Sequence, residues 1–306
     1  MSNEKRPHGW AAAITRRLTP PPAGTSISSA PAAPARRRYE SSQHVVTVDG
    51  LRLRVSVARQ GAGTPLVLIG GIGAPLELWE PFRRALSTET LAVDLPGVGG
   101  SATLRRPRSM WGVACILDRL LDQLDYPTVD VLGVSWGGGV AQYLALRRRS
   151  RVRLLILAST GFGLWSMPGD PRALVHLLMP ARYFSKSHFL QIAPTLYGGE
   201  TGRHPERLPA QAVVRSATRP SAIGYVHQLA ATATWVALPL LPLIRTETLV
   251  LNGDDDPIVH VATARIMAAA LPYGRLRIVR GGGHMFLLDQ PREAADIVGS
   301  FLRSGL

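Results

Sequence analysis

The segment from 129 to 142 constrains the fold of this chain more than any other, because it joins a strand, a tight turn and a helix. An apolar, β-branched run of strand length ends at Gly133, and an apolar helical pattern begins at Val140. Between them lies the pattern Gly-x-Ser-x-Gly, centred on Ser135. Such a turn exposes the serine above the edge of a sheet, and its glycines avoid collisions with the neighbouring strand and helix. Ser135 is therefore the predicted nucleophile, beside the free N–H groups of a helix start.

Strand and helix patterns alternate through most of the chain. Two alternating segments flank Asp49-Gly50, a dipeptide that supplies the positive φ angles of a hairpin turn. The predicted strands are 44–48, 51–57, 65–69, 90–95, 129–133, 154–158, 249–251 and 276–279, and the predicted core helices are 76–86, 110–124, 262–270 and 291–302. This alternation predicts an α/β fold with a mostly parallel central sheet and helices on both faces.

One long interval, between the strands at 154–158 and 249–251, has no clear strand pattern. It holds short helical patterns, many prolines and frequent large apolar side chains, which predict an inserted helical cap over 161–245. The α/β core then comprises 41–160 and 246–306. We expect part of the cap's apolar side chains to line a substrate pocket, with Trp165, Met167, Met179, Phe184 and Tyr197 as candidates.

Residues 1–40 are rich in proline, alanine, serine and arginine, and this composition predicts a disordered basic arm. Its longest apolar piece, Trp10 to Ile14, is too short for the core of an export signal. The one cysteine, Cys115, fits a reducing compartment, so we expect a cytoplasmic protein. No apolar run approaches the ~20 residues of a membrane span, and no transmembrane segment is expected.

The formal net charge of +14 is strongly basic and is carried mainly by arginine, most densely at 36–38 and 147–153. One interpretation is attraction to an anionic surface or to nucleic acid. The other is a solvated, arginine-rich surface that reflects composition alone. We favour the second and expect no nucleic-acid partner, because no aromatic-plus-basic motif of a nucleic-acid module accompanies the charge.

A serine hydroxyl needs a base to take its proton, and the base needs an acid to orient it. After a turn of this kind the expected chain order is acid, then histidine. Asp254, Asp255 and Asp256 follow the strand at 249–251, at the edge of the sheet where active sites lie. We choose Asp256, because Pro257 stiffens the loop directly after it, and we keep Asp255 as the alternative. The predicted base is His284, which follows three glycines beyond the last strand.

Two backbone N–H groups must stabilise the oxyanion that forms when serine attacks a carbonyl. One is predicted to be that of Trp136, directly after the nucleophile. The other is predicted to be that of Ile72, in the glycine-rich loop after the strand at 65–69. The sequence has no metal-ligand cluster, no cysteine pair and no phosphate loop, so neither a metal nor another cofactor is expected.

Several stretches resemble the α/β-hydrolase superfamily over roughly residues 44 to 303. More narrowly, they are similar to intracellular medium-chain-length poly(3-hydroxyalkanoate) depolymerases. The shared-looking stretches are 71–78, 94–101, 133–138, 192–199 and 253–257, and the cap stretch around Tyr197 is the most specific of them. The resemblance implies Ser135 as nucleophile, Asp256 as acid and His284 as base.

The resemblance further implies a serine ester hydrolase that cleaves poly(3-hydroxyalkanoate), with medium-chain-length polymers as the expected substrates, and that associates with storage granules. A general carboxylesterase or lipase acting on small or lipid esters is the nearest alternative. A non-catalytic protein that binds polymer granules through apolar cap side chains is an alternative of another class.

Overall fold

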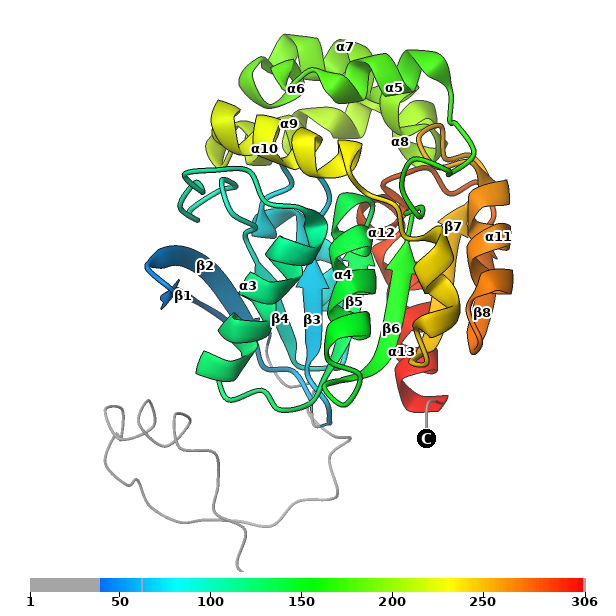
Figure 1. Ribbon diagram of the computed structural model, residues 1–306. Helices are drawn as coiled ribbons and strands as arrows, with labels where there is room; N and C mark the ends of the chain where they lie inside the picture. Colours follow the sequence, from blue (N-terminus) through cyan, green and yellow to red (C-terminus); the bar gives the residue numbers. More distant parts are fainter. Residues whose placement is uncertain (1–38, 62, 305–306) are drawn as a thin grey trace, which may run out of the picture.

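The centre of the molecule is an eight-stranded sheet (Figure 1), seen in a computed structural model that describes residues 39–61 and 63–304. The strand order is β1-β2-β4-β3-β5-β6-β7-β8. The strands are β1 (Ser41–Val48), β2 (Leu51–Ala58), β3 (Leu66–Ile69), β4 (Thr90–Val93), β5 (Val129–Val134), β6 (Val152–Ala158), β7 (Glu247–Gly253) and β8 (Gly274–Val279). All pairs from β4 to β8 are parallel, whereas β2 pairs antiparallel with both β1 and β4. The prediction of a mostly parallel sheet is confirmed.

The first two strands form the hairpin expected from the Asp49-Gly50 dipeptide. Asp49 has φ 49° and Gly50 has φ 79°, and Val48 pairs with Leu51 directly across the turn. Asparagine, aspartate and glycine tolerate such positive φ angles better than other residues, so the turn follows from two local residues.

Helices cover both faces of the sheet, as predicted, and alternate strand residues face the two layers. In β3, Val67 and Ile69 pack into one hydrophobic cluster, and Leu66 and Leu68 pack into the other. The first face carries α3 (Met110–Gln123), α4 (Trp136–Arg147), α11 (Val261–Ala270) and the short 3₁₀ helix η3 (Leu238–Leu243). The second carries α2 (Glu80–Ala85), α12 (Phe286–Asp289) and α13 (Pro291–Ser304).

The helix predicted over 76–86 is divided into two pieces. A 3₁₀ turn, η1 (Leu76–Trp79), precedes α2, and Pro81 stands in the first turn of α2. Proline has no N–H to donate and its ring excludes the preceding turn of an α-helix, so a single continuous helix cannot form here.

Except for η3, the helices between β6 and β7 gather above the carboxyl ends of the parallel strands (Figure 1). They fall inside the segment 161–245 that we assign to the cap. Some of them share an apolar cluster that includes Phe189, Leu196 and Leu208, whereas Tyr183 and Tyr225 pack into the cluster of the first sheet face. These elements are α5 (Pro171–Leu178), α6 (Ala181–Phe184), α7 (Lys186–Tyr197), α8 (Gly199–Arg203), η2 (Pro205–Arg207), α9 (Leu208–Ala217) and α10 (Ala222–Ala233).

The expected basic arm, 1–40, lies almost entirely outside the described residues. Tyr39 is described, and it belongs to the core rather than to an arm: its hydroxyl donates to Glu80 Oε2, and the Arg84 guanidinium lies 4.4 Å from its ring centroid. The ordered core therefore begins no later than Tyr39, two residues before the predicted boundary.

Part of the arginine run at 147–153 is paired with buried carboxylates. Asp118 accepts hydrogen bonds from Arg147 Nε at 3.0 Å and from Arg148 Nε at 2.9 Å. Asp130 Oδ2 accepts a hydrogen bond from Arg153 Nη2. These ion pairs hold the carboxyl end of α4 and the start of β6 against neighbouring elements. No helix within 39–61 and 63–304 is long and apolar enough to cross a membrane.

Candidate active site

Ser135 occupies the turn between β5 and α4 in a strained backbone conformation, with φ 52° and ψ −120°. A non-glycine residue in such a region costs roughly 1–3 kcal/mol and persists only when its surroundings hold it. Here the Ser135 N–H donates to the Ala158 carbonyl at 2.9 Å. Its carbonyl accepts from the Gly138 N–H at 2.9 Å and the Thr160 hydroxyl at 2.6 Å. The strands and the helix around the turn therefore fix the serine in place.

The two glycines of the motif are needed for close backbone packing. A Cβ on Gly137 would lie 2.3 Å from the Ile69 carbonyl oxygen and 2.4 Å from that of Gly70. A Cβ on Gly133 would lie 2.5 Å from the Gly137 carbonyl oxygen. Backbone atoms cannot move aside without displacing β3 or α4, so the steric reason inferred from the sequence holds.

His284 and Asp256 form a buried pair at the carboxyl ends of β8 and β7. His284 Nδ1 lies 3.0 Å from Asp256 Oδ1 and 2.9 Å from Oδ2. Asp256 Oδ1 also accepts the backbone N–H groups of Ile258 at 2.9 Å and Val259 at 3.0 Å, which hold the carboxylate in its orientation. With Nδ1 engaged by the carboxylate, Nε2 is the ring nitrogen that can take a proton.

The two neighbouring aspartates have other partners. Asp255, the alternative acid, accepts the Gly199 N–H at 2.9 Å and Arg203 Nη1 at 3.1 Å. Asp254 accepts the Gly281 N–H at 2.6 Å. Of the three carboxylates, the structure brings Asp256 to His284 and turns Asp255 toward the cap.

Ile72 and Trp136, the predicted oxyanion donors, come from two different segments beside the serine turn. Ile72 is in the loop after β3, and Trp136 is the first residue of α4. The loop passes close to Ser135: a Cβ on Gly71 would lie 3.3 Å from Ser135 Cβ and 3.8 Å from its Oγ. A glycine there leaves room for a carbonyl group between the loop and the serine.

Cap side chains hold both of these segments. The Tyr183 hydroxyl donates to the Ile72 carbonyl at 2.8 Å, and Gln228 Oε1 accepts the Gly73 N–H at 2.7 Å. The Gln228 carbonyl also accepts the Trp136 indole N–H at 2.9 Å. Burial raises the pKa of the Tyr183 phenol, although nearby arginines lower it, so the group donates as a neutral hydroxyl. The cap thus positions the loop that carries Ile72.

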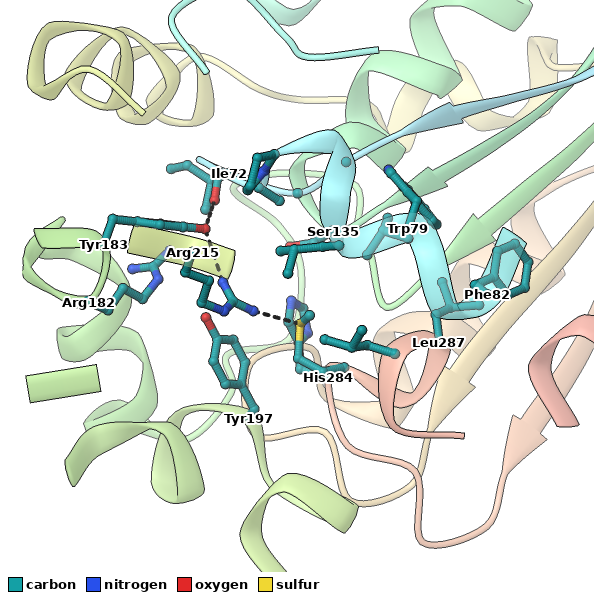
Figure 2. Close-up of a pocket in the computed structure, with 18 of the residues that line it drawn as sticks. Ile72, Trp79, Phe82, Ser135, Arg182, Tyr183, Tyr197, Arg215, His284 and Leu287 are labelled. Atoms are coloured by element: carbon teal, nitrogen blue, oxygen red, sulfur yellow. Dashed lines mark hydrogen bonds between the residues drawn. The ribbon is translucent and has the colours of Figure 1, made fainter. Parts of the chain in front are cut away.

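Two pockets meet at Ser135 and share Ile72 and Leu177 as lining residues. The first, here the His284 pocket, encloses about 670 Å³ including its open mouth. Its walls are apolar where Trp79, Phe82 and Leu287 lie, and they carry Arg182, Tyr183, Tyr197 and Arg215 on the cap side (Figure 2). The second, here the Trp136 pocket, encloses about 1130 Å³ and is lined almost wholly by apolar side chains, among them Leu174, Leu229 and Trp235.

Only two of the five cap residues predicted to line a pocket do so. Tyr197 lines the His284 pocket and Met167 lines the Trp136 pocket. Trp165, Met179 and Phe184 line neither pocket and are 58%, 53% and 42% exposed on the outer surface of the cap. Their segments turn other side chains inward, which apolar content alone does not reveal.

Sequence reasoning missed the polar residues of the cap that contact the site, namely Arg182, Tyr183, Arg215 and Gln228. No signal marked them, because each stands in a helical pattern among many other arginines and polar side chains. The described part of the chain holds no group of three or more His, Cys, Asp or Glu side chains arranged to bind a metal ion.

Comparison with known proteins agrees with this architecture. Residues 64–291 match the model of the alpha/beta hydrolase fold family. A poly(3-hydroxyalkanoate) depolymerase of Ectopseudomonas oleovorans is 42% identical over 263 residues, which cover 84% of this chain and 91% of that protein.

Two solved structures share the fold at lower identity. The enol-lactonase from Burkholderia xenovorans LB400 has a TM-score of 0.72 and 24% identity, covering 85% of this chain and all of its own. A thermophilic esterase from Thermogutta terrifontis has a TM-score of 0.72 and 23% identity, covering 86% of this chain and 99% of its own. The chain therefore belongs to the alpha/beta hydrolase fold family, and it is an ester hydrolase that resembles poly(3-hydroxyalkanoate) depolymerases.

Proposed function

We propose that this enzyme hydrolyses the ester bonds of poly(3-hydroxyalkanoate), preferably with medium-length side chains, through an acyl-serine intermediate on Ser135. The observation that carries the proposal is the placement of Ser135 where two largely apolar pockets meet, beside the His284–Asp256 pair. An ester bound at Ser135 has an acyl group and an alcohol group, and each needs its own binding pocket. The depolymerase relative at 42% identity supplies the substrate class.

In the first half-reaction, Ser135 Oγ attacks the ester carbonyl carbon while His284 Nε2 takes its proton. The carbonyl oxygen becomes an oxyanion held by the Ile72 and Trp136 N–H groups. The bond between the carbonyl carbon and the alcohol oxygen then breaks, and that oxygen takes the proton from His284. Asp256 keeps the imidazole oriented and stabilises its positive charge throughout.

In the second half-reaction, water replaces the alcohol. His284 takes a proton from the water as its oxygen attacks the acyl carbon, and the bond to Ser135 Oγ breaks. The proton returns to Ser135, and the acyl group leaves as a carboxylic acid. No external reagent other than water is consumed.

The lining of the Trp136 pocket favours an aliphatic substrate. Each methylene group buried there is worth about 0.8 kcal/mol, so several together discriminate strongly between acyl groups. Leu164, Met167 and Leu178 line this pocket and are also exposed at 62%, 46% and 62%. An apolar rim of this kind lets an enzyme meet a water-insoluble chain before one bond enters the site.

The outer surface of the cap supports association with the polymer itself. Further exposed apolar side chains are Trp165, Val175, Met179, Ile223 and Val226. Exposed apolar side chains that gather into a patch mark a surface that binds another apolar surface. We propose that these cap side chains contact the surface of storage granules.

Incubation with amorphous granules of poly(3-hydroxyoctanoate), followed by chromatography of the released acids, tests the proposal. We expect 3-hydroxyoctanoate or its short oligomers from the wild type and none from Ser135→Ala. A fluorophosphonate probe should label the wild type and not the variant. Labelling and small-ester turnover without polymer hydrolysis would favour a general carboxylesterase, whereas granule binding without labelling would favour the non-catalytic alternative.

A further inference from the structure

Arg215 is a buried cation in the His284 pocket whose N–H donors are largely unused. It is 2% exposed, and among the described residues it forms no ion pair. Within the described part of the chain its hydrogen bonds are weak: Nη1 donates to the Tyr183 hydroxyl at 3.4 Å and Nη2 to the Met285 sulfur at 3.8 Å. Its Nε has no hydrogen-bond partner among the same residues. A guanidinium has five N–H donors in a planar fork, a shape that matches a carboxylate.

A second buried arginine, Arg182, lies in the same pocket wall. Its Nη1 donates to the carbonyls of His176, Leu177 and Met179 near the end of α5, at 3.5, 3.2 and 3.3 Å. These bonds give Arg182 a structural role, but its charge remains in the pocket and its Nε is also without a partner. Two arginines therefore line this pocket, and no carboxylate within 39–61 and 63–304 lies within ion-pair distance of either.

Asp289, an acidic group that interacts electrostatically with Arg215, has other hydrogen-bond partners. Asp289 accepts the Thr201 hydroxyl at 2.6 Å and the Gln211 amide at 3.2 Å. Aromatic rings do surround Arg215, with Tyr197 at 5.1 Å and Phe189 at 5.2 Å from its guanidinium carbon. Ring faces attract the cation but accept few of its N–H groups, so room for an anion remains.

Figure 2 shows Arg215 between Tyr183 and Tyr197, facing the space that Ser135 and His284 also face. Two residues that contact Arg215 also contact the Ile72 loop and His284. Tyr183 binds the Ile72 carbonyl, and Tyr197 stacks on the His284 ring at a centroid distance of 6.3 Å. An anion bound by Arg215 would therefore lie close to the bond being cleaved.

The leaving alcohol belongs in this pocket. His284 gives its proton to the alcohol oxygen, and His284 lines the His284 pocket but not the Trp136 pocket. When the last ester bond of a polyhydroxyalkanoate breaks, the leaving group is a 3-hydroxy acid. Its carboxylate carbon is three bonds from the leaving oxygen, a span of about 3.8 Å when extended.

We infer that Arg215, assisted by the charge of Arg182, binds the terminal carboxylate of the polyester, so that the enzyme removes 3-hydroxy acids one at a time from the carboxyl end. This inference rests on the proposed function, and it specifies the direction of attack. The acyl part of the chain then extends through the Trp136 pocket toward the exposed apolar rim.

The test compares a 3-hydroxyoctanoate trimer with a free carboxylate and the same trimer capped as a methyl ester. For the wild type we expect kcat/KM at least about tenfold higher for the free acid. The methyl ester has no charge with which to form a hydrogen-bonded ion pair with the arginine. Arg215→Gln should bring the ratio close to one, and Arg215→Lys should keep part of it. Arg219→Gln, which removes an exposed arginine next to Phe184, should keep the wild-type ratio.

The ratio of kcat/KM for the free acid to that for the methyl ester, measured on the wild type, tests the carboxylate site even if Arg215 variants fail to fold. Equal hydrolysis of both trimers, or a mixture of long and short oligomers released from polymer granules in the first minutes, would overturn the carboxylate site and leave the polyester function standing. Hydrolysis of neither trimer by enzyme that turns over p-nitrophenyl octanoate would overturn the proposed function and this inference together.

Discussion

Tyr197 of the cap contacts His284 of the core in two ways. Its carbonyl accepts the His284 backbone N–H at 2.7 Å, and the two rings stack at an interplanar angle of 11° with centroids 6.3 Å apart. Asp256 holds one edge of the imidazole, and the Tyr197 ring lies nearly parallel to it. The predicted base is therefore positioned by both parts of the molecule.

Loss of the tyrosine ring should impair orientation of the imidazole. We expect Tyr197→Ala to lower kcat/KM for p-nitrophenyl octanoate about tenfold or more, because small displacements of a catalytic group are costly. Tyr197→Phe keeps the ring and the backbone bond, so it should retain most of the activity. Equal losses in the two variants would show that the hydroxyl, rather than the ring, is what matters.

The proposed triad predicts a graded response to substitution. Ser135→Ala and His284→Ala should each lower ester turnover by at least about 10³-fold with the fold preserved, since triad members act as a unit. Asp256→Asn should also be severe, whereas Asp254→Asn and Asp255→Asn should be mild. Steady-state kinetics with circular dichroism checks this, and a severe Asp255→Asn beside a mild Asp256→Asn would refute the choice of acid.

The hydrogen bond from Tyr183 to the Ile72 carbonyl should support catalysis. We expect Tyr183→Phe to lower kcat several-fold, by about the factor that one net hydrogen bond of ~1 kcal/mol provides, with little change in KM. Tyr225→Phe is the matched control, because the Tyr225 hydroxyl is also buried but donates to the Leu177 carbonyl at 2.6 Å. The thermal stability of Tyr225→Phe should fall about as much as that of Tyr183→Phe, because each loses one hydrogen bond. The kcat of Tyr225→Phe should stay within about twofold of the wild type.

The serine turn should not tolerate a methyl group at Gly137. A Cβ there would collide with two backbone carbonyls of β3 and its loop, so Gly137→Ala should lower the free energy of unfolding by about 1–3 kcal/mol or more. Gly299→Ala is the control, since a Cβ there would lie 3.2 Å from the flexible end of Arg303 and alanine favours a helix. Thermal or urea denaturation distinguishes them, and equal stability of both variants would contradict the packing argument.

The Trp136 pocket should determine acyl preference. We expect kcat/KM for p-nitrophenyl esters of about six to ten carbons to exceed that for acetate by ~10–200-fold, the usual range for apolar pockets. Leu229→Trp, which fills part of this pocket, should reduce the preference, whereas Leu190→Trp on the outer cap should not. Acetate as the best substrate of the wild type would refute the assignment.

Much of the core follows from local sequence. The positive φ angles of Asp49-Gly50 predict the hairpin, and the glycines around Ser135 predict the turn that exposes it. These features depend on the backbone sterics of a few adjacent residues, so they can be inferred without knowing what packs against them. The strand and helix alternation is equally local, and it predicts the parallel sheet because few topologies can bury such a pattern.

Other features were decided only by the tertiary structure. The sequence places Asp255 and Asp256 side by side, but the approach of Gly199 and Arg203 from the cap occupies Asp255 and leaves Asp256 for His284. Phe184 and Tyr197 have similar apolar character, yet Phe184 is exposed and Tyr197 lies against His284. Which face of a cap helix turns inward depends on contacts with residues far away in the chain, and composition carries no record of them.

Arg215 illustrates this division most clearly. In the sequence it is one of many arginines, and the strongly basic composition favours a solvated position for each. Only the folded chain shows that it is buried beside Tyr183 and Met285, without an ion-pair partner among the described residues. The sequence by itself determined the α/β core, the serine turn and the order of acid and histidine, because these depend on short-range sterics and strand–helix periodicity. The tertiary structure decided which charges and apolar side chains meet at Ser135, because burial and electrostatic pairing depend on segments that the chain brings together only when it folds.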